Sequence, residues 1–343
     1  MDKQTYMLNQ LKVLTGIPSP TGMTHEISNY LMAELTRLGF TPERTPKGTV
    51  MCCLGGSGHP LALSAHVDAL GAMVRAVKSN GCLRYTQVGG YSDNAIENET
   101  VKIHTRSGKV YTGTVQSTHA SVHVWGRTTD EKRSDESLEI VVDEETWSKA
   151  DTEALGIRPG DYISLDPRTV VTESGFIKSR HLDDKASSAV LLTLAREVAE
   201  GRVVLPRRTY IVFTVYEEVG HGAAPLSKLD LEDMLAVDMG CVGDDLACKE
   251  NMVSICAKDS AGPYDYDFTS ELVALAEEKG LPYAVDIYPS YSSDASAALR
   301  AGLDARFALC GQGVYASHGY ERTHVKGMLA TLSLVTAYVE KRK

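Results

Sequence analysis

Acidic residues and histidines recur at a few points of the chain where they could do chemistry. His66 and Asp68 stand two residues apart in SAHVD, Asp183 belongs to HLDDK, and Glu217 and Glu218 are adjacent in YEEVG. A histidine close to a carboxylate can bind a metal ion while the acid orients the ring. Of two adjacent acids, one can bind a metal and the other can take a proton from water. Each pattern alone also suits an ordinary strand end or helix start.

Asp238 and a histidine near the end of the sequence complete a set of metal-binding side chains. Asp238 follows an apolar stretch in LAVDMG, where it either binds a metal or caps a turn. His324 precedes the last predicted helix, and His318 in SHGY competes with it. The predicted ligands are two imidazoles and three carboxylates, namely His66, Asp183, Glu218, Asp238 and His324. This set suits two divalent ions, Zn²⁺ above all, with Co²⁺ or Mn²⁺ as alternatives.

The elements that must position these residues alternate between apolar strands and helices. Three of the candidate positions follow the end of a predicted apolar strand, which is where sites lie in open α/β sheets. The pattern therefore predicts an α/β sheet domain. Strands are predicted over 50–54, 61–65, 209–215, 234–237, 252–257, 283–288 and 303–309, and helices over 24–39, 183–200, 271–279, 294–300 and 325–340.

A central stretch differs from the sequence on either side of it. In residues 71–171, Val, Thr, Tyr and Ile alternate with polar residues, and turns such as SNG and GGYSDN are frequent. We expect a catalytic domain made of 1–70 and 172–343, with 71–171 as an inserted β-rich domain for substrate access or oligomerisation. STHASVH within it alternates as a strand, so His119 and His123 would share one face. We interpret them as structural residues near an oligomer contact rather than as a third metal site.

Composition excludes several classes of protein. Of the 343 residues, 35 are Lys or Arg and 45 are Asp or Glu, and the net charge of −10 argues against a nucleic-acid binder. There is no apolar run of about 18 residues and no secretory signal at the N-terminus, so neither a membrane span nor export is expected. The seven cysteines include no CxxC pair, which favours reduced thiols in a cytoplasmic protein. Cys241 is interpreted as a structural thiol rather than a nucleophile.

In their order and spacing, five stretches resemble the dinuclear metal aminopeptidases of the TET type, a group that includes glutamyl and deblocking aminopeptidases. They are SAHVDALGAMV, GFIKSRHLDDKASSAVLL, VFTVYEEVGHGAA, LAVDMG and RTH before the last helix. The resemblance implies a zinc-peptidase three-layer α/β sandwich with a mixed central sheet and an inserted domain like a small β-barrel. It also implies dimers that assemble into a hollow tetrahedral dodecamer.

The resemblance further implies an activity and a role for each residue. The enzyme would remove N-terminal residues from short peptides by attack of a water that bridges the two metal ions. His66 would bind one ion and be oriented by Asp68, Asp183 would bridge both ions, and Glu217 would be the general base. Glu218 and Asp238 would each bind a metal ion, Asp238 together with His324 or His66.

Two alternative functions and several details stay open at this point. The alternatives are a metal-dependent deacylase, or another amide hydrolase on the same scaffold, and a non-catalytic metal-binding assembly protein. The sequence does not identify the preferred N-terminal residue, the physiological metal or the role of Lys185.

Overall fold

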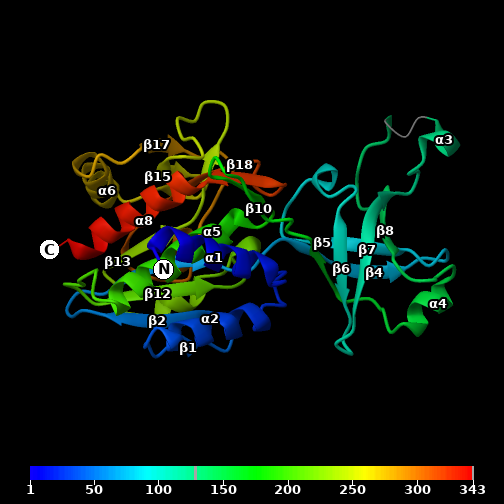
Figure 1. Ribbon diagram of the computed structural model, residues 1–343, viewed down its shortest axis with the longest axis horizontal. Coiled ribbons are helices and arrows are strands. Elements are labelled where there is room, and N and C mark those ends of the chain that lie inside the picture. Colours follow the sequence, from blue (N-terminus) through cyan, green and yellow to red (C-terminus); the bar gives the residue numbers. More distant parts are fainter. Residues whose placement is uncertain (127–129, 342–343) are drawn as a thin grey trace. The chain divides into compact units, whose positions relative to one another are not determined.

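The computed structural model describes residues 1–126 and 130–341 (Figure 1). The chain divides into two compact units, one made of residues 1–68 and the described residues from 168 onward, the other of residues 69–167. The inserted unit therefore starts directly after Asp68, and every predicted site residue belongs to the first unit.

A mixed sheet forms the centre of the first unit. Along its main path the strands follow the order β1-β2-β12-β3-β13-β18-β19-β11-β10. Strands β12, β3, β13 and β18 run parallel to one another, whereas β2 pairs antiparallel with β12, and β15 and β19 pair antiparallel with β18. The strands of this unit are β1 (Glu43–Arg44), β2 (Val50–Gly55), β3 (Leu61–His66), β10 (Val170–Val171), β11 (Phe176–Ser179), β12 (Thr209–Thr214), β13 (Asp233–Val237), β14 (Gly240–Val242), β15 (Val253–Asp259), β16 (Gly262–Pro263), β17 (Tyr283–Ile287), β18 (Arg306–Tyr315) and β19 (Glu321–His324).

Helices cover both faces of this sheet because its strands are apolar on both sides. In β3, Leu61 and Leu63 belong to one buried core and Ala62 to another, and alternate residues of a strand point to opposite faces. The first core also contains residues of α1 (Lys3–Gly16), α2 (His25–Arg37), α5 (Leu182–Ala199), α6 (Tyr266–Glu278) and α8 (Val325–Glu340). The second core contains residues of the 3₁₀ turn η4 (Ala224–Lys228) and of α7 (Asp294–Arg300). The expected three-layer arrangement is thus confirmed.

The second unit is a closed barrel of six strands in the order β4-β5-β8-β7-β6-β9. Pairing of β4 with β9 closes it, and an apolar cluster that includes Val74, Tyr85 and Ile163 fills it. The predicted β-rich insertion is confirmed, but its two short helices were not foreseen. The elements are β4 (Gly71–Val77), β5 (Leu83–Val88), the 3₁₀ turn η1 (Asp93–Ala95), β6 (Thr100–His104), β7 (Val110–Ser117), α3 (Val122–Trp125), β8 (Leu138–Val142), α4 (Lys149–Ala154) and β9 (Tyr162–Leu165).

The predicted strand that would carry His119 and His123 is wrong. Strand β7 ends at Ser117, whose hydroxyl accepts a hydrogen bond from the backbone N–H of His119 (3.0 Å). Such a side-chain bond turns the chain and competes with strand pairing. His119 then meets Glu131, with Nδ1 and Oε2 3.0 Å apart, and His123 lies in α3. The two histidines therefore do not share a strand face.

All seven cysteines are free, and burial raises the pKa of the Cys241 thiol to about 12, so this thiol stays protonated. In the part of the chain that the structure describes, no helix combines the length and the apolar character that a membrane crossing requires.

Candidate active site

The carboxyl ends of three neighbouring parallel strands bring the candidate residues together. Strand β3 ends at His66, β12 leads into the short turn η3 (Glu217–Val219), and β13 ends directly before Asp238. Asp183 comes from the start of α5, where its φ of −77° and ψ of 105° are not yet helical. Because parallel strands end at the same edge of a sheet, residues far apart in the sequence converge there.

The carboxylate of Asp183 lies between two imidazole rings. Its Oδ1 is 2.9 Å from His66 Nε2, and its Oδ2 is 3.3 Å from His318 Nε2. His66 and Asp183 are buried, whereas the His318 side chain is 40% exposed. A carboxylate that offers one oxygen to each side has the arrangement required to bridge two metal ions.

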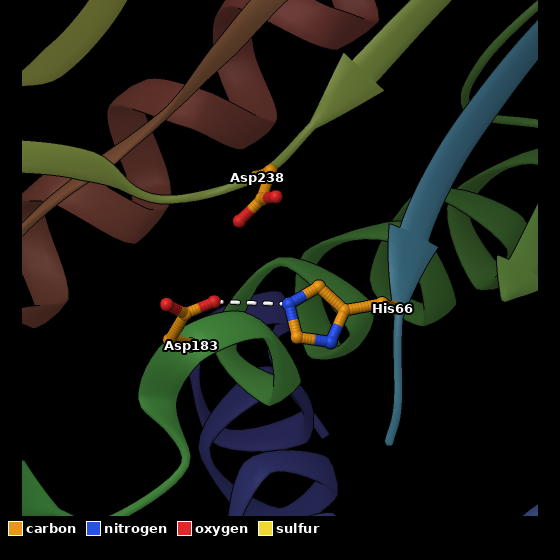
Figure 2. A group of neighbouring side chains, drawn as sticks. All are labelled: His66, Asp183 and Asp238. Carbon is orange, nitrogen blue, oxygen red and sulfur yellow. Dashed lines mark hydrogen bonds and ion pairs between the residues drawn. The ribbon is translucent and has the colours of Figure 1, made fainter. Parts of the chain in front are cut away.

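Two groups of atoms that could bind a metal ion form around Asp183. His66, Asp183 and Asp238 each offer one atom, and these atoms lie within 4.8 Å of one another (Figure 2). On the other side, Glu218 Oε2 lies 3.6 Å from His318 Nε2. The structure therefore places Asp238 with His66 and Glu218 with His318, a pairing that the sequence left open.

The two adjacent glutamates differ in their surroundings. Glu217 Oε2 lies 3.8 Å from His66 Nε2, and its side chain is 13% exposed. The Glu218 side chain is only 3% exposed, and its buried Oε1 has no hydrogen-bond partner among the described residues. A buried oxygen without a partner requires an explanation, because the cost of removing it from water is otherwise not offset. Glu218 is thus suited to an ion, and Glu217 is the more accessible of the two.

Asp68 holds the turn that carries both glutamates. Its two carboxylate oxygens accept the backbone N–H groups of Glu217 (3.2 Å) and Glu218 (3.3 Å), and Thr21 donates to Oδ2 (2.7 Å). His66 Nδ1 lies 3.0 Å from the backbone oxygen of Asp68 and 3.7 Å from its Oδ1. Asp68 therefore contacts His66 mainly through its backbone, and its carboxylate fixes the glutamate pair.

Glu321 holds two other site residues, and reasoning from sequence missed it. Its carboxylate accepts the backbone N–H of Asp183 and that of His318, each at 3.1 Å. The side chain is almost fully buried in β19. The available signal was an acid between two candidate histidines, in a segment that forms a strand.

The structure does not bring His324 to this group of residues. His324 is the N-cap of α8: its Nδ1 accepts the backbone N–H of Lys326 (3.0 Å), and its Nε2 donates to the backbone oxygen of Ser174 (2.9 Å). Its ring also meets Phe176 edge-on, with centroids 4.8 Å apart. Both ring nitrogens are therefore engaged away from the site, and His318 occupies the position that the sequence analysis gave to His324.

Three non-glycine residues with left-handed backbone angles flank the site. His181, Tyr216 and His318 have φ values of 65°, 71° and 63°. Such angles are costly for residues with a side chain, and they cluster at functional sites where the surrounding structure enforces them. Here they mark the sharp turns that lead into Asp183 and Glu217 and that present the ring of His318.

The site concentrates more negative charge than its own residues can neutralise. Burial raises the pKa values of Glu217 and Glu218 well above the usual range, and burial with the charge of Asp183 raises the pKa of Asp238 to about 7. Burial alone would lower the pKa of His66, but its bond with Asp183 and the nearby acids raise it well above normal. Acids held this close to one another ionise together only when cations lie between them. The donor set and the unpaired Glu218 oxygen therefore fit divalent metal ions.

A cleft of about 510 Å³ opens over these residues. Asp183, Glu217, Glu218, Asp238 and His318 all line it. The rest of its wall comes from Gly220 after η3 and from the segments after β13, β15, β17 and β18, which contribute Met239, Cys241, Tyr291 and four serines. The candidate metal-binding group thus lies beside a space large enough for part of a small substrate.

Comparison with known proteins finds the same fold and related sequences. The family model described as M42 glutamyl aminopeptidase matches residues 48–334. A putative aminopeptidase of Bacillus subtilis strain 168 is 45% identical over 333 residues, which is 96% of each chain. The glutamyl aminopeptidase of Lactococcus lactis strain MG1363 is 26% identical over 247 residues, which is 69% of this chain and 68% of that protein.

A solved structure shares the fold across the whole chain. It is the TET1 peptidase of Pyrococcus horikoshii, described as able to assemble into a tetrahedron or a large octahedral shell. The TM-score is 0.87 at 21% sequence identity, with 98% of this chain and all of that chain covered. At this identity the likeness concerns the fold.

Proposed function

Because the chain belongs to the M42 glutamyl aminopeptidase family, we propose that this aminopeptidase removes the N-terminal residue of short peptides with two divalent metal ions. The observation that carries the proposal is the Asp183 carboxylate, which offers one oxygen to His66 and the other to His318. His66 and Asp238 would hold one ion, Glu218 and His318 the other, and Asp183 would bridge them. Zn²⁺ suits these donors best, and Co²⁺ or Mn²⁺ are alternatives.

Glu217 is the general base of the proposed mechanism. When bound, the ions would polarise the scissile carbonyl and lower the pKa of a water. Glu217 lines the cleft and is the more exposed of the two glutamates, so its carboxylate can take the proton of the attacking water. The same carboxyl group then gives the proton to the departing amine. Asp68 positions Glu217 by accepting its backbone N–H.

Hydrolysis of matched substrates tests the activity. A panel of free-amine and N-acylated aminoacyl p-nitroanilides is assayed with chelator-treated protein and again after addition of Zn²⁺, Co²⁺ or Mn²⁺. We expect metal-dependent cleavage of the free-amine series only, with two ions bound per chain by elemental analysis. Cleavage of only the acylated series would replace the proposal with the deacylase alternative. No cleavage with any metal would favour the non-catalytic metal-binding protein.

We also propose that the chain forms dimers that assemble into a tetrahedral dodecamer. The TET1 peptidase of P. horikoshii, which shares the fold, is described as able to assemble into a tetrahedron or a large octahedral shell, and a solved structure of PhTET1 is described as a dodecamer. Native mass spectrometry of the purified protein tests this, and a mass of twelve chains of 37.2 kDa is expected. A monomer or an isolated dimer at micromolar concentration would contradict it.

A further inference from the structure

The described wall of the cleft offers no cationic side chain that could recognise an acidic substrate side chain. Among the described residues that line it, none is lysine or arginine. Apart from Gly220 and the site residues already assigned, the wall consists of Met239, Cys241, Tyr291 and four serines, Ser290 among them. Met239 is buried, Cys241 and Tyr291 are half-buried, and Ser290 lies at the exposed rim. The inner wall is therefore apolar or weakly polar, and hydroxyl groups surround its mouth.

The acids of the cleft are not available to bind a basic side chain. Asp183, Glu217, Glu218 and Asp238 are the acids in its wall, and the proposed function assigns all of them to metal binding or proton transfer. Two divalent ions would balance their four negative charges, so neither sign of charge remains in excess. A charged substrate side chain would lose part of its water in this cleft and would meet only neutral hydroxyl, thiol and thioether groups, with no described side chain of opposite charge left to pair with it.

We propose that this aminopeptidase prefers peptides whose N-terminal side chain is uncharged, and that it discriminates against N-terminal Glu, Asp, Lys and Arg. The inference rests on the proposed function and adds the substrate class. It separates this chain from the L. lactis relative, whose name specifies a glutamyl substrate. The neutral wall of Met239, Cys241, Tyr291 and the rim serines carries the argument.

Two substrate pairs, one isosteric and one of similar length, compare neutral with charged side chains. Gln- and Glu-p-nitroanilide differ only in the amide or carboxylate, and Met- and Lys-p-nitroanilide compare a neutral with a cationic unbranched side chain. We expect kcat/KM to be at least about tenfold higher for the neutral member of each pair. Cleavage of the Glu or Lys substrate as fast as its neutral partner would overturn the inference and leave the aminopeptidase activity intact.

Binding of free amino acids separates failure of the inference from failure of the proposed function. Free L-Gln and L-Glu are reaction products, so calorimetry measures their binding without turnover. We expect L-Gln to bind at least about tenfold more tightly than L-Glu. If no p-nitroanilide is cleaved, the proposed function fails, and this ratio alone decides whether the cleft rejects charge. Equal or tighter binding of L-Glu refutes the inference.

A cation placed on the rim should reverse the selectivity. Ser290 is exposed, and its side chain makes no hydrogen bond to another residue of the described chain, so Ser290→Arg places a guanidinium at the mouth of the cleft with little disturbance. We expect the Glu/Gln ratio of kcat/KM to rise at least about tenfold. Ser57→Arg is the matched control. Ser57 is exposed and precedes the start of β3, at the end of that strand opposite to His66. The Glu/Gln ratio of kcat/KM should not change in this variant. An unchanged ratio in active Ser290→Arg enzyme would contradict the assignment of this cleft to the substrate side chain.

Discussion

Two histidines six residues apart are predicted to respond in opposite ways to the same substitution. His318 lies 3.3 Å from Asp183 and 3.6 Å from Glu218, whereas His324 caps α8 and bonds to Ser174. We compare His318→Asn and His324→Asn, since asparagine is a favourable N-cap and keeps that function at 324. His318→Asn should lose one of two metal ions and most activity. His324→Asn should keep both metal ions and most of the activity.

The expected magnitudes follow from the contacts of each ring. Loss of a metal-binding imidazole should lower the affinity for the second ion, and with it kcat/KM, at least about 100-fold. Because the His318 side chain is 40% exposed, its substitution should change the unfolding free energy of the metal-free protein by less than about 1 kcal/mol. His324→Ala removes a cap, which costs about 1 kcal/mol, and a hydrogen bond to a backbone oxygen, which costs about 1 kcal/mol more. His324→Ala should therefore lower the unfolding free energy by about 2 kcal/mol, and His324→Asn should lower it by less.

The assay combines elemental analysis, Zn²⁺ titration, kcat/KM on one p-nitroanilide, and urea unfolding of the metal-free variants. Comparing the metal affinities of His318→Asn and His324→Asn as a ratio cancels any general effect of replacing a histidine by asparagine. Retention of two tightly bound ions by His318→Asn, or loss of an ion from folded His324→Asn, would refute the assignment of the second imidazole.

Three further results are expected from the same geometry. Glu217→Gln should lower kcat at least about 100-fold, the usual contribution of a general base, while elemental analysis still finds two ions; a near-normal rate would remove Glu217 from that role. Glu321→Gln keeps only one good acceptor for the N–H groups of Asp183 and His318. The metal dissociation constant should therefore rise about 10–100-fold. An unchanged constant would contradict the positioning role of Glu321. In the metal-free protein, burial raises the pKa values of Asp238 and Glu321 to about 7 and about 8. The folded chain then holds protons that the unfolded chain releases, so its stability should fall as pH rises from about 4 to about 8. Added Zn²⁺ should restore stability at pH 8, and a melting temperature that rises over this range without metal would contradict the reasoning.

The sheet domain was predictable because its central strands are apolar on both faces. Runs such as Leu61–His66 and Thr209–Thr214 become central strands between two helical layers, as continuous apolar segments of this length indicate. The barrel insertion was predictable from its alternation and turns. Its helix α3 was not, because the residues before it alternate like a strand, whereas the bond from the His119 N–H to the Ser117 hydroxyl helps to turn the chain away from the strand.

Three site positions at strand ends were predictable from the sequence. The same reason explains why the second imidazole was assigned to the wrong histidine. His66, Glu217 and Asp238 follow central parallel strands, and the sheet alone brings such positions together. The second imidazole depends instead on the turn between β18 and β19. There a left-handed residue at 318 and a bond from its N–H to Glu321 decide which ring faces Asp183.

These contacts explain why Glu321 and His318 have to be considered together. The Glu321 carboxylate accepts the N–H of His318 and the N–H of Asp183, and His318 in turn contacts Asp183 through its ring. One buried acid therefore sets the distance between two proposed ligands that lie 135 residues apart in the sequence. His324, three residues after Glu321 at the end of β19, cannot take this place, because the alternation of the strand and the cap of α8 direct its ring toward Ser174. Spacing in the sequence offers both histidines as candidates, and the backbone contacts of Glu321 distinguish them.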